Sequence, residues 1–233
     1  MIEGLVFIFC CIAAAIAYNM HKLTAAGAVA GSLLAIALYL GAGGPAILFM
    51  GVFFILAVLA TSWNSSRKIK SGLARPGDGT RDIYQVMANG GAAFIVALLA
   101  MLWPKQEMYL LLIAAAFSSA AADTISSELG SLYGSRFVNI LNWKHGARGQ
   151  NGVVSIEGLL FGIAASIIVA CCYLATVPAG LFHFTVIVLA GTIGNLTDSL
   201  LGAAFENKGM LNNNQVNFTN TAVAVLSAWL MTR

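Results

Sequence analysis

Two acidic stretches at the ends of apolar runs are the residues best suited to chemistry. The first, 121–130, contains Asp123 and Glu128, and the second, 195–202, contains Asp198. A carboxylate is costly at membrane depth, so one that lies there faces a polar cavity and marks a functional site. We therefore expect the two acidic helix ends to form one site that faces the cytoplasm.

Asp123, Glu128 and Asp198 supply the hard oxygen ligands that Mg²⁺ takes while it also bridges substrate phosphates. Enzymatic phosphoryl transfer depends mainly on positioning and charge stabilisation, so it needs no covalent nucleophile. Basic side chains complete such a site by neutralising phosphate charge. The basic residues beside the Asn-Gly turns are the predicted phosphate ligands: Arg81, Lys144 and Arg148.

Helical geometry sets a condition on the predicted metal ligands. Glu128 is rotated by about 140° from Asp123 on a regular helix of 3.6 residues per turn. Both carboxylates reach one ion if the helix ends or unwinds near Ser127, an ending that Gly130 favours. The alternative is that Glu128 binds a basic residue of a loop.

The composition is that of a polytopic membrane protein. The 233 residues are 59% hydrophobic and 9% charged, whereas soluble domains carry about 25% charged residues. We predict one all-α integral-membrane domain over 1–233, without a separate soluble domain. The net charge of +3 is small and bears on topology, so no nucleic-acid partner is expected.

Apolar runs of nearly sufficient length predict a bundle of about eight transmembrane helices, with six or seven as alternatives. A span needs roughly 20 residues, so the first and last runs are marginal. The runs cover 2–17, 24–40, 45–62, 86–103, 108–127, 153–175, 183–203 and 217–231.

The basic residues predict the orientation in the membrane. With the amino terminus outside, the inner loops are 18–23, 63–85, 128–152 and 204–216, and the positive-inside rule is obeyed. We therefore expect a protein of the cell membrane whose polar site is built by the three longer loops on the cytoplasmic face. All basic residues except Lys105 and Arg233 lie inside: Lys22, Arg67, Lys68, Lys70, Arg75, Arg81, Arg136, Lys144, Arg148 and Lys208.

Five motifs in order carry a resemblance to a known family. They occupy 81–90, 122–130, 149–155, 198–203 and 214–217. Together they resemble the transmembrane protein nineteen family of integral-membrane proteins, whose plant chloroplast members are phytyl-phosphate kinases. The family is distantly similar to the phytol and dolichol kinases, for which CTP is a usual donor.

The resemblance implies a set of site residues. The sequence departs from the family pattern Asn-Gly-Gly-Val-Ser at one position, where Val153 stands in place of the second glycine. A β-branched residue such as valine resists a positive φ. The implied residues are Arg81, Asp82, Gln85, Asn89, Asp123, Ser127, Glu128, Asn151, Ser155, Asp198, Ser199, Asn214 and Asn217.

These observations predict a membrane kinase that transfers the γ-phosphoryl group of CTP or ATP to phytyl or polyprenyl monophosphate. Asp123, Glu128 and Asp198 would hold Mg²⁺, and Asn89 and Asn151 would orient the acceptor, whose apolar tail would lie between helices. One alternative is a cation-coupled transporter with ion ligands at interrupted helices. Another is a different lipid enzyme, such as a cytidylyltransferase or an alcohol phosphotransferase.

Overall fold

The computed structural model is a bundle of helices, and it describes residues 2–74, 79–103 and 106–233. The predictions that concern Arg75 and Lys105 fall outside these residues. The long helices are α1 (Ile2–Asn19), α2 (Ala25–Ala42), α3 (Gly44–Ser62), α5 (Ile83–Leu102), α6 (Gln106–Tyr133), α7 (Ile156–Thr176), α8 (Leu181–Ala204) and α9 (Asn213–Met231).

The expected membrane architecture is confirmed. Six of the described helices, α2, α3, α5, α6, α7 and α8, are long and apolar enough to cross a membrane. The apolar stretch Glu3–Asn19 of α1 is shorter than these spans, and α9 is more polar, as expected for the two marginal runs. The eight long helices correspond one by one to the eight predicted spans.

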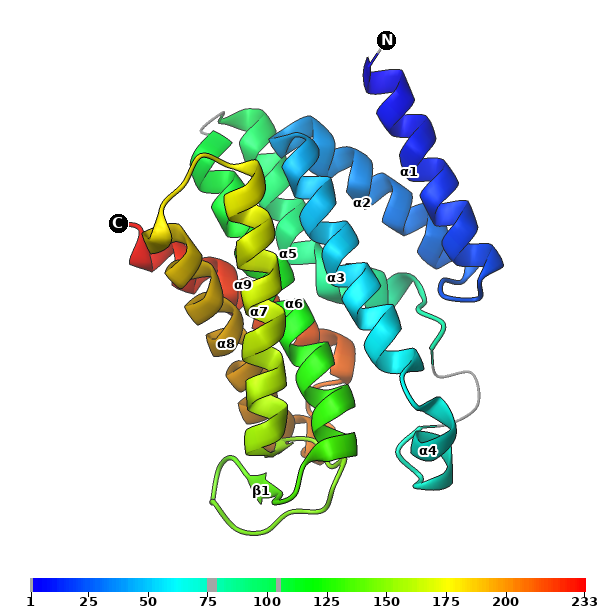
Figure 1. The fold of residues 1–233 in the computed structure, drawn as a ribbon, viewed down its shortest axis with the longest axis vertical. Helices are drawn as coiled ribbons and strands as arrows, with labels where there is room; N and C mark the ends of the chain where they lie inside the picture. The colour runs from blue at the N-terminus through cyan, green and yellow to red at the C-terminus, as the bar shows by residue number, and fades with distance from the viewer. Residues whose placement is uncertain (1, 75–78, 104–105) are drawn as a thin grey trace.

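Four short elements fall in the connections. The helix α4 (Ser65–Lys70) follows α3, and a 3₁₀ helix, η1 (Glu206–Lys208), follows α8. The strands β1 (Val138–Asn139) and β2 (Val153–Val154) pair antiparallel, with Val138 opposite Val154. In Figure 1 these elements gather at the lower end of the bundle, so one end carries the long polar connections.

Side-chain caps fix where several helices begin. Thr24 accepts a hydrogen bond from the backbone of Gly27 at the start of α2, and Ser155 does the same for Gly158 at the start of α7. Asp82 and Asn212 each form a capping box, with the glutamine three positions on. Such caps satisfy backbone N–H groups that have no partner within the helix. All four caps lie at the end of the bundle that carries the long connections.

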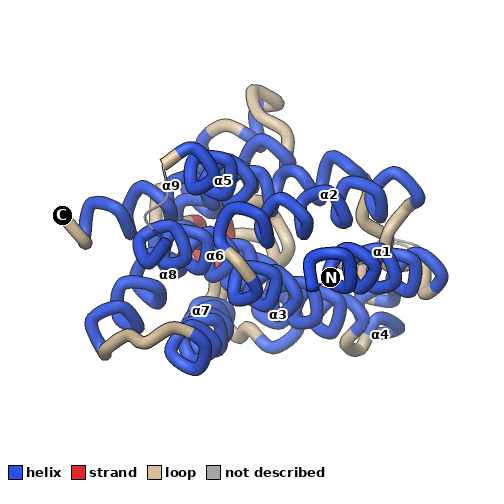
Figure 2. The backbone as a smooth tube through the Cα atoms, turned by 90° about the horizontal axis from the view of Figure 1, so that it is seen from above, coloured by secondary structure: helices blue, strands red, loops and turns tan. Residues whose placement is uncertain are grey.

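The helix α6 is the centre of the bundle. It contacts α3, α5, α7, α8 and α9, and Figure 2 shows it enclosed by its neighbours, with α1 standing to one side against α2. Its middle section from Leu111 to Ala122 is buried throughout. Because α6 ends in the polar connections, residues of its last two turns are placed where several helices converge.

A polar pocket beneath the bundle

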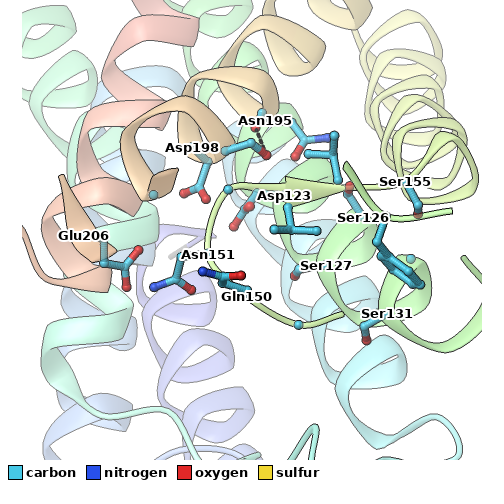
Figure 3. A pocket seen from close by; sticks show the side chains of 18 of the residues that line it. Asp123, Ser126, Ser127, Ser131, Gln150, Asn151, Ser155, Asn195, Asp198 and Glu206 are labelled. Atoms are coloured by element: carbon cyan, nitrogen blue, oxygen red, sulfur yellow. Dashed lines mark hydrogen bonds between the residues drawn. The ribbon is translucent and has the colours of Figure 1, made fainter. Parts of the chain in front are cut away.

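A polar cavity lies between the carboxyl ends of α6 and α8. Its volume is about 170 Å³, and Figure 3 shows its side chains converging from both helices and from the connection before α7. The lining residues that carry polar side chains are Asp123, Ser126, Ser127, Ser131, Gln150, Asn151, Ser155, Asn195, Asp198, Ser199, Glu206 and Asn213.

Asp123 and Asp198 face each other in this pocket. The two carboxyl groups interact with each other, and Figure 3 shows their side chains pointing toward one another. Like charges this close repel, so a proton or a cation must lie between them. The sequence prediction placed these two residues in one site, and the structure brings them together.

Asparagines of α9 hold Asp198 from its other side. Asn220, which is fully buried, donates from Nδ2 to Asp198 Oδ2 at 2.8 Å. Asn217 donates to the same oxygen at 3.2 Å when its amide nitrogen faces the carboxylate. Ser119 in turn donates to Asn220 Oδ1 at 3.0 Å, which fixes the orientation of that amide. The carboxylate is therefore held in place before any ligand binds.

The connection between α6 and α7 closes the pocket from below. Gly149 and Gly152 have φ values of 77° and 74°, which residues with a Cβ rarely adopt. A Cβ on Gly152 would lie 2.2 Å from the Cβ of Ala203, so the backbone passes directly against α8. Asn207 donates to the backbone oxygen of Asn151 at 2.9 Å. These contacts place Gln150 and Asn151 beside the two carboxylates (Figure 3).

Val153 causes no conflict in this turn. It lies in β2, pairs with Asn139 and contacts Gly146. The positive φ values fall on the glycines before it, so the departure from the family pattern is accommodated by extended backbone.

The structure does not bring Glu128 together with Asp123 and shows the alternative, in which Glu128 binds a basic residue of a loop. The helix α6 does not end near Ser127 but continues to Tyr133. Glu128 therefore points away from Asp123 and forms an ion pair with Lys68 at 2.5 Å. Within the described part of the chain, no three Asp, Glu, His or Cys side chains are grouped so that they could hold a metal.

The predicted phosphate ligands also lie elsewhere. Lys144 and Arg148 are exposed and do not line the pocket, although Arg148 Nε donates to the backbone oxygen of Ser131 at its rim. Asn214 lies in the first turn of α9, and its Oδ1 is buried without a described partner. None of the lining residues in the described chain is Lys or Arg.

The loop 63–85 does not contribute to this pocket through any of its described residues. Asp82 and Gln85 cap α5, and Arg81, Gln85 and Asn89 line a second, smaller cavity. Arg81 lies near Glu128, and Arg81 Nη2 donates to Thr61 Oγ1 at 3.2 Å. Burial lowers the pKa of the Arg81 guanidinium, and the negative charge of Glu128 opposes that effect.

Several residues that line the pocket or hold Asp198 in place were not among the predicted site residues. Asn195 is buried three positions before Asp198, and Asn220 lies three positions after Asn217. Residues three or four apart share a helix face, so this spacing could have identified both. Glu206 accepts a hydrogen bond from Asn151, a contact between two loops that no spacing along the chain reveals.

Comparisons with known proteins identify the relatives of this chain. It is 32% identical to the uncharacterized membrane protein MJ0933 of Methanocaldococcus jannaschii, over 91% of this chain and 87% of that protein. It is 30% identical to the chloroplastic protein VTE6 of Arabidopsis thaliana, over 90% of this chain and 65% of VTE6. The protein PGR of the same plant is 28% identical, over 82% of this chain and 75% of PGR.

No solved structure matches the chain. A family model described as integral membrane protein DUF92 matches residues 8–225. The narrower identification with transmembrane protein nineteen stays a prediction. On the extent of that match, and on the similarity to the archaeal protein, the chain belongs to the DUF92 family of integral membrane proteins.

Proposed function

We propose that this protein is a membrane kinase that transfers the γ-phosphoryl group of CTP or ATP to an isoprenyl monophosphate. The observation that carries the proposal is the facing pair Asp123 and Asp198, held by amides inside a polar pocket at one end of the apolar spans. The resemblance of five motifs to a family that includes phytyl-phosphate kinases supplies the substrate class. The similarity to VTE6 is consistent with that class but covers only 65% of VTE6.

Mg²⁺ fits the donors that the pocket offers. Asp123 and Asp198 are two opposed carboxylates, and two carboxylates with substrate phosphates are a usual ligand set for this ion. Asp123 and Asp198 would hold the ion, which would supply positive charge to offset that of the substrate phosphates. Because the described lining residues include no Lys or Arg, a triphosphate has no other source of positive charge in the pocket.

The remaining polar residues would position the two substrates. Ser127, Asn151 and Ser155 line the wall formed by α6 and the connection, and Ser199 lines the wall formed by α8. Their hydroxyl and amide groups can donate hydrogen bonds to phosphate oxygens. The acceptor's apolar tail would lie among the spans, and its phosphate would enter the pocket at the cytoplasmic face of the cell membrane.

The proposed reaction balances without a protein nucleophile. An oxygen of the lipid monophosphate attacks the γ-phosphorus, the bond from that phosphorus to the β,γ-bridging oxygen breaks, and the nucleoside diphosphate leaves. Because the attacking phosphate oxygen is already ionised, no strong general base is needed. What the chain must supply is position and charge, as enzymatic phosphoryl transfer requires.

The test uses purified protein in liposomes with Mg²⁺, phytyl or geranylgeranyl phosphate, and CTP or ATP labelled on the γ-phosphate. We expect labelled lipid diphosphate, and a loss of at least 100-fold in Asp123→Asn and in Asp198→Asn. Glu3→Gln, which removes an exposed carboxylate on α1, is the matched control and should keep full activity. No lipid diphosphate from any pairing of substrates would contradict the proposal.

The same assay separates the alternatives. Cytidyl transfer would place the α-phosphate of labelled CTP in the lipid, whereas kinase action places the γ-phosphate there. A cation-coupled transporter would move ions across the liposome membrane without consuming nucleotide.

A further inference from the structure

The connection between α6 and α7 contains a turn that leaves its apolar side chains exposed. The turn runs from Asn139 to Lys144, and we call it the Trp143 tip. Trp143 is 76% exposed, Leu141 is 51% exposed, and Lys144 beside them is exposed as well. None of these three residues lines the carboxylate pocket, the polar cavity that contains Asp123 and Asp198. The tip therefore presents apolar and basic side chains for which the proposed transfer has no use.

Hydrogen bonds within the tip hold it as an ordered turn. The backbone N–H of Trp143 donates to the backbone oxygen of Asn139, and that of Asn139 donates to the oxygen of Lys144, each at 2.9 Å. Asn139 Oδ1 accepts from the backbone of Leu141 at 3.0 Å, and Asn142 Oδ1 accepts from the backbone of Lys144 at 3.0 Å. The backbone of the turn thus sets the direction in which the indole ring leaves the chain.

Tryptophan is an unfavourable residue for this backbone position. Trp143 has a φ of 58°, a left-handed conformation that glycine adopts readily and bulky residues rarely adopt. The exposed ring also gains little from burial within the chain. Neither backbone conformation nor packing explains a tryptophan here, and residues held in such conformations are concentrated at functional sites.

The tip lies close to the point where a membrane span begins. Asn139 is paired with Val153, and Val153 precedes Ile156, the first residue of α7, by three positions. Three residues extend over at most about 10 Å, and the head-group layer of a bilayer is about 5–8 Å thick on each side. Figure 1 shows the connection directly beyond the ends of α6 and α7. The tip is therefore within reach of the head groups.

The connection that carries the tip is basic. Residues 129–156 contain Arg136, Lys144 and Arg148 and no Asp or Glu. Arg148 Nε donates to the backbone oxygen of Ser131, whereas the side chains of Arg136 and Lys144 are exposed. Anionic lipid head groups attract basic residues that lie near the membrane surface. The charge of the connection is complementary to such a surface.

We propose that the Trp143 tip docks on the head-group layer of a membrane that contains anionic phospholipid. The ring of Trp143 lies in the interface, where tryptophan is enriched because one part of it is apolar and its N–H is polar. Leu141 enters the edge of the apolar core, and Lys144 pairs with lipid anions. A protein partner fits less well, because a stable interface buries about 1,200–2,000 Å², far more than two exposed apolar side chains offer. The docking does not depend on the proposed transfer.

The test follows the fluorescence of Trp143 in the full-length protein in nanodiscs. The emission of Trp143→Phe is subtracted from that of the wild type, so that the difference reports this one of the four tryptophans. The nanodiscs contain phosphatidylcholine alone or with phosphatidylserine, each with and without brominated acyl chains. We expect brominated lipid to quench Trp143 at least twofold more strongly when phosphatidylserine is present.

Three results of this measurement would overturn the proposal. The first is no quenching by lipid, and the second is quenching that does not depend on phosphatidylserine. The third is an emission that ignores lipid but shifts when cytosolic protein is added, which would assign the tip to a protein partner.

Lys144→Gln tests the contribution of charge. We expect it to reduce the phosphatidylserine-dependent quenching of Trp143 at least twofold. Lys208→Gln is the matched control, because Lys208 is exposed on η1, outside the connection between α6 and α7, and it should be quenched as the wild type is. An equal loss in both variants would mean that the charge of the whole surface acts, and not the tip.

Trp143→Gly separates docking from folding. Because glycine adopts the positive φ readily, its unfolding temperature in detergent should equal or exceed that of the wild type. Phosphatidylserine should slow amide hydrogen exchange of residues 139–144 at least threefold in the wild type and should have no such effect in Trp143→Gly. A lower unfolding temperature would mean that Trp143 serves the fold, and retained protection in the variant would show that the ring is not the anchor.

Discussion

Lys68 and Glu128 form an ion pair in which one partner is almost wholly buried. Lys68 is 2% exposed and Glu128 is 26% exposed, and Lys68 Nζ also donates to the backbone oxygen of Ala60 at 2.6 Å. Removing one member of a buried pair leaves an uncompensated charge in a poorly hydrated place. The pair therefore joins α4 and the end of α3 to α6.

Glu128→Gln should lower the free energy of unfolding by about 1–3 kcal/mol, less than for a fully buried pair because Glu128 is partly exposed. The double variant Lys68→Met with Glu128→Gln should lose less free energy of unfolding than the sum of the losses in the two single variants. Unfolding in mixed micelles measures both. A loss of metal affinity in Glu128→Gln without a loss of stability would contradict this role.

The carboxylate pocket leads to a prediction about metal removal. Because none of its described lining residues is basic, the charge of a nucleoside triphosphate would be balanced there by the metal alone. We expect EDTA to weaken nucleotide binding at least 100-fold, and Mg²⁺ to restore it. Equilibrium dialysis with labelled CTP and ATP measures this. Tight binding in EDTA would imply that a cation such as Arg148 reaches the phosphates.

At the scale of single residues, the sequence predicted a position where the free-energy cost of burying a charged side chain determines it. Asp123 and Asp198 lie deep in apolar runs, and that depth alone marks them. The sequence left two partners open for Glu128, because its partner depends on how far α6 continues and on the burial of Lys68. Lys68 lies in a run of basic residues that is typical of a topology signal. Its neighbours in the sequence do not indicate that its side chain is buried against the end of α3.

The helix α6 has three faces with different environments. At about 100° per residue, Asp123 and Ser127 point into the carboxylate pocket. Phe117 and Glu128 lie about 120–140° around the helix, toward the second, smaller cavity that Arg81 lines and toward Lys68. Ile125 and Leu129 lie on the third face, which with α3 and α7 forms an apolar groove of about 430 Å³. One helix thus separates three chemically distinct regions.

Gly130 and Gly158 allow α6 and α7 to approach closely beside the pocket. A Cβ on Gly130 would lie 2.7 Å from the Cα of Gly158, as is common where small residues meet in membrane helices. Gly130→Val should therefore destabilise the bundle by about 1–3 kcal/mol and weaken nucleotide binding, since Gly130 also lines the pocket. Gly51→Val on α3 is the control, because a Cβ there meets nothing within 4 Å. An unchanged free energy of unfolding in Gly130→Val would mean that α6 and α7 can move apart at this point without a loss of stability.

The elements were largely predictable because hydropathy dominates at this scale. Each of the eight long helices follows from an apolar run, and capping residues such as Asp82 and Asn212 mark the starts of two of them. The helix α4 was not predicted. Its six residues are mostly polar, and the buried ion pair of Lys68 holds it, a tertiary contact that local sequence does not encode. The pairing of β1 with β2 is likewise decided by the connection as a whole.

For the whole molecule, the distribution of basic residues predicts which end faces the cytoplasm. Trp143 is 76% exposed at the end that carries the polar connections, and Gly180 lies in the turn between α7 and α8. A membrane-impermeant thiol reagent should label Gly180→Cys in intact cells, and Trp143→Cys only after lysis. The wild type, whose four cysteines lie in helices α1 and α7, gives the background. The reverse pattern would invert the orientation.

The shared wall between the two cavities has a thermodynamic consequence. Phe117 and Asp123 belong to one continuous helix, so a ligand in the second cavity and a nucleotide in the carboxylate pocket would both contact α6. If the first ligand shifts α6 and so changes the affinity for the second by some factor, linkage requires the second to change the affinity for the first by the same factor. The occupancy of the second cavity would then change the nucleotide concentration at which the carboxylate pocket fills.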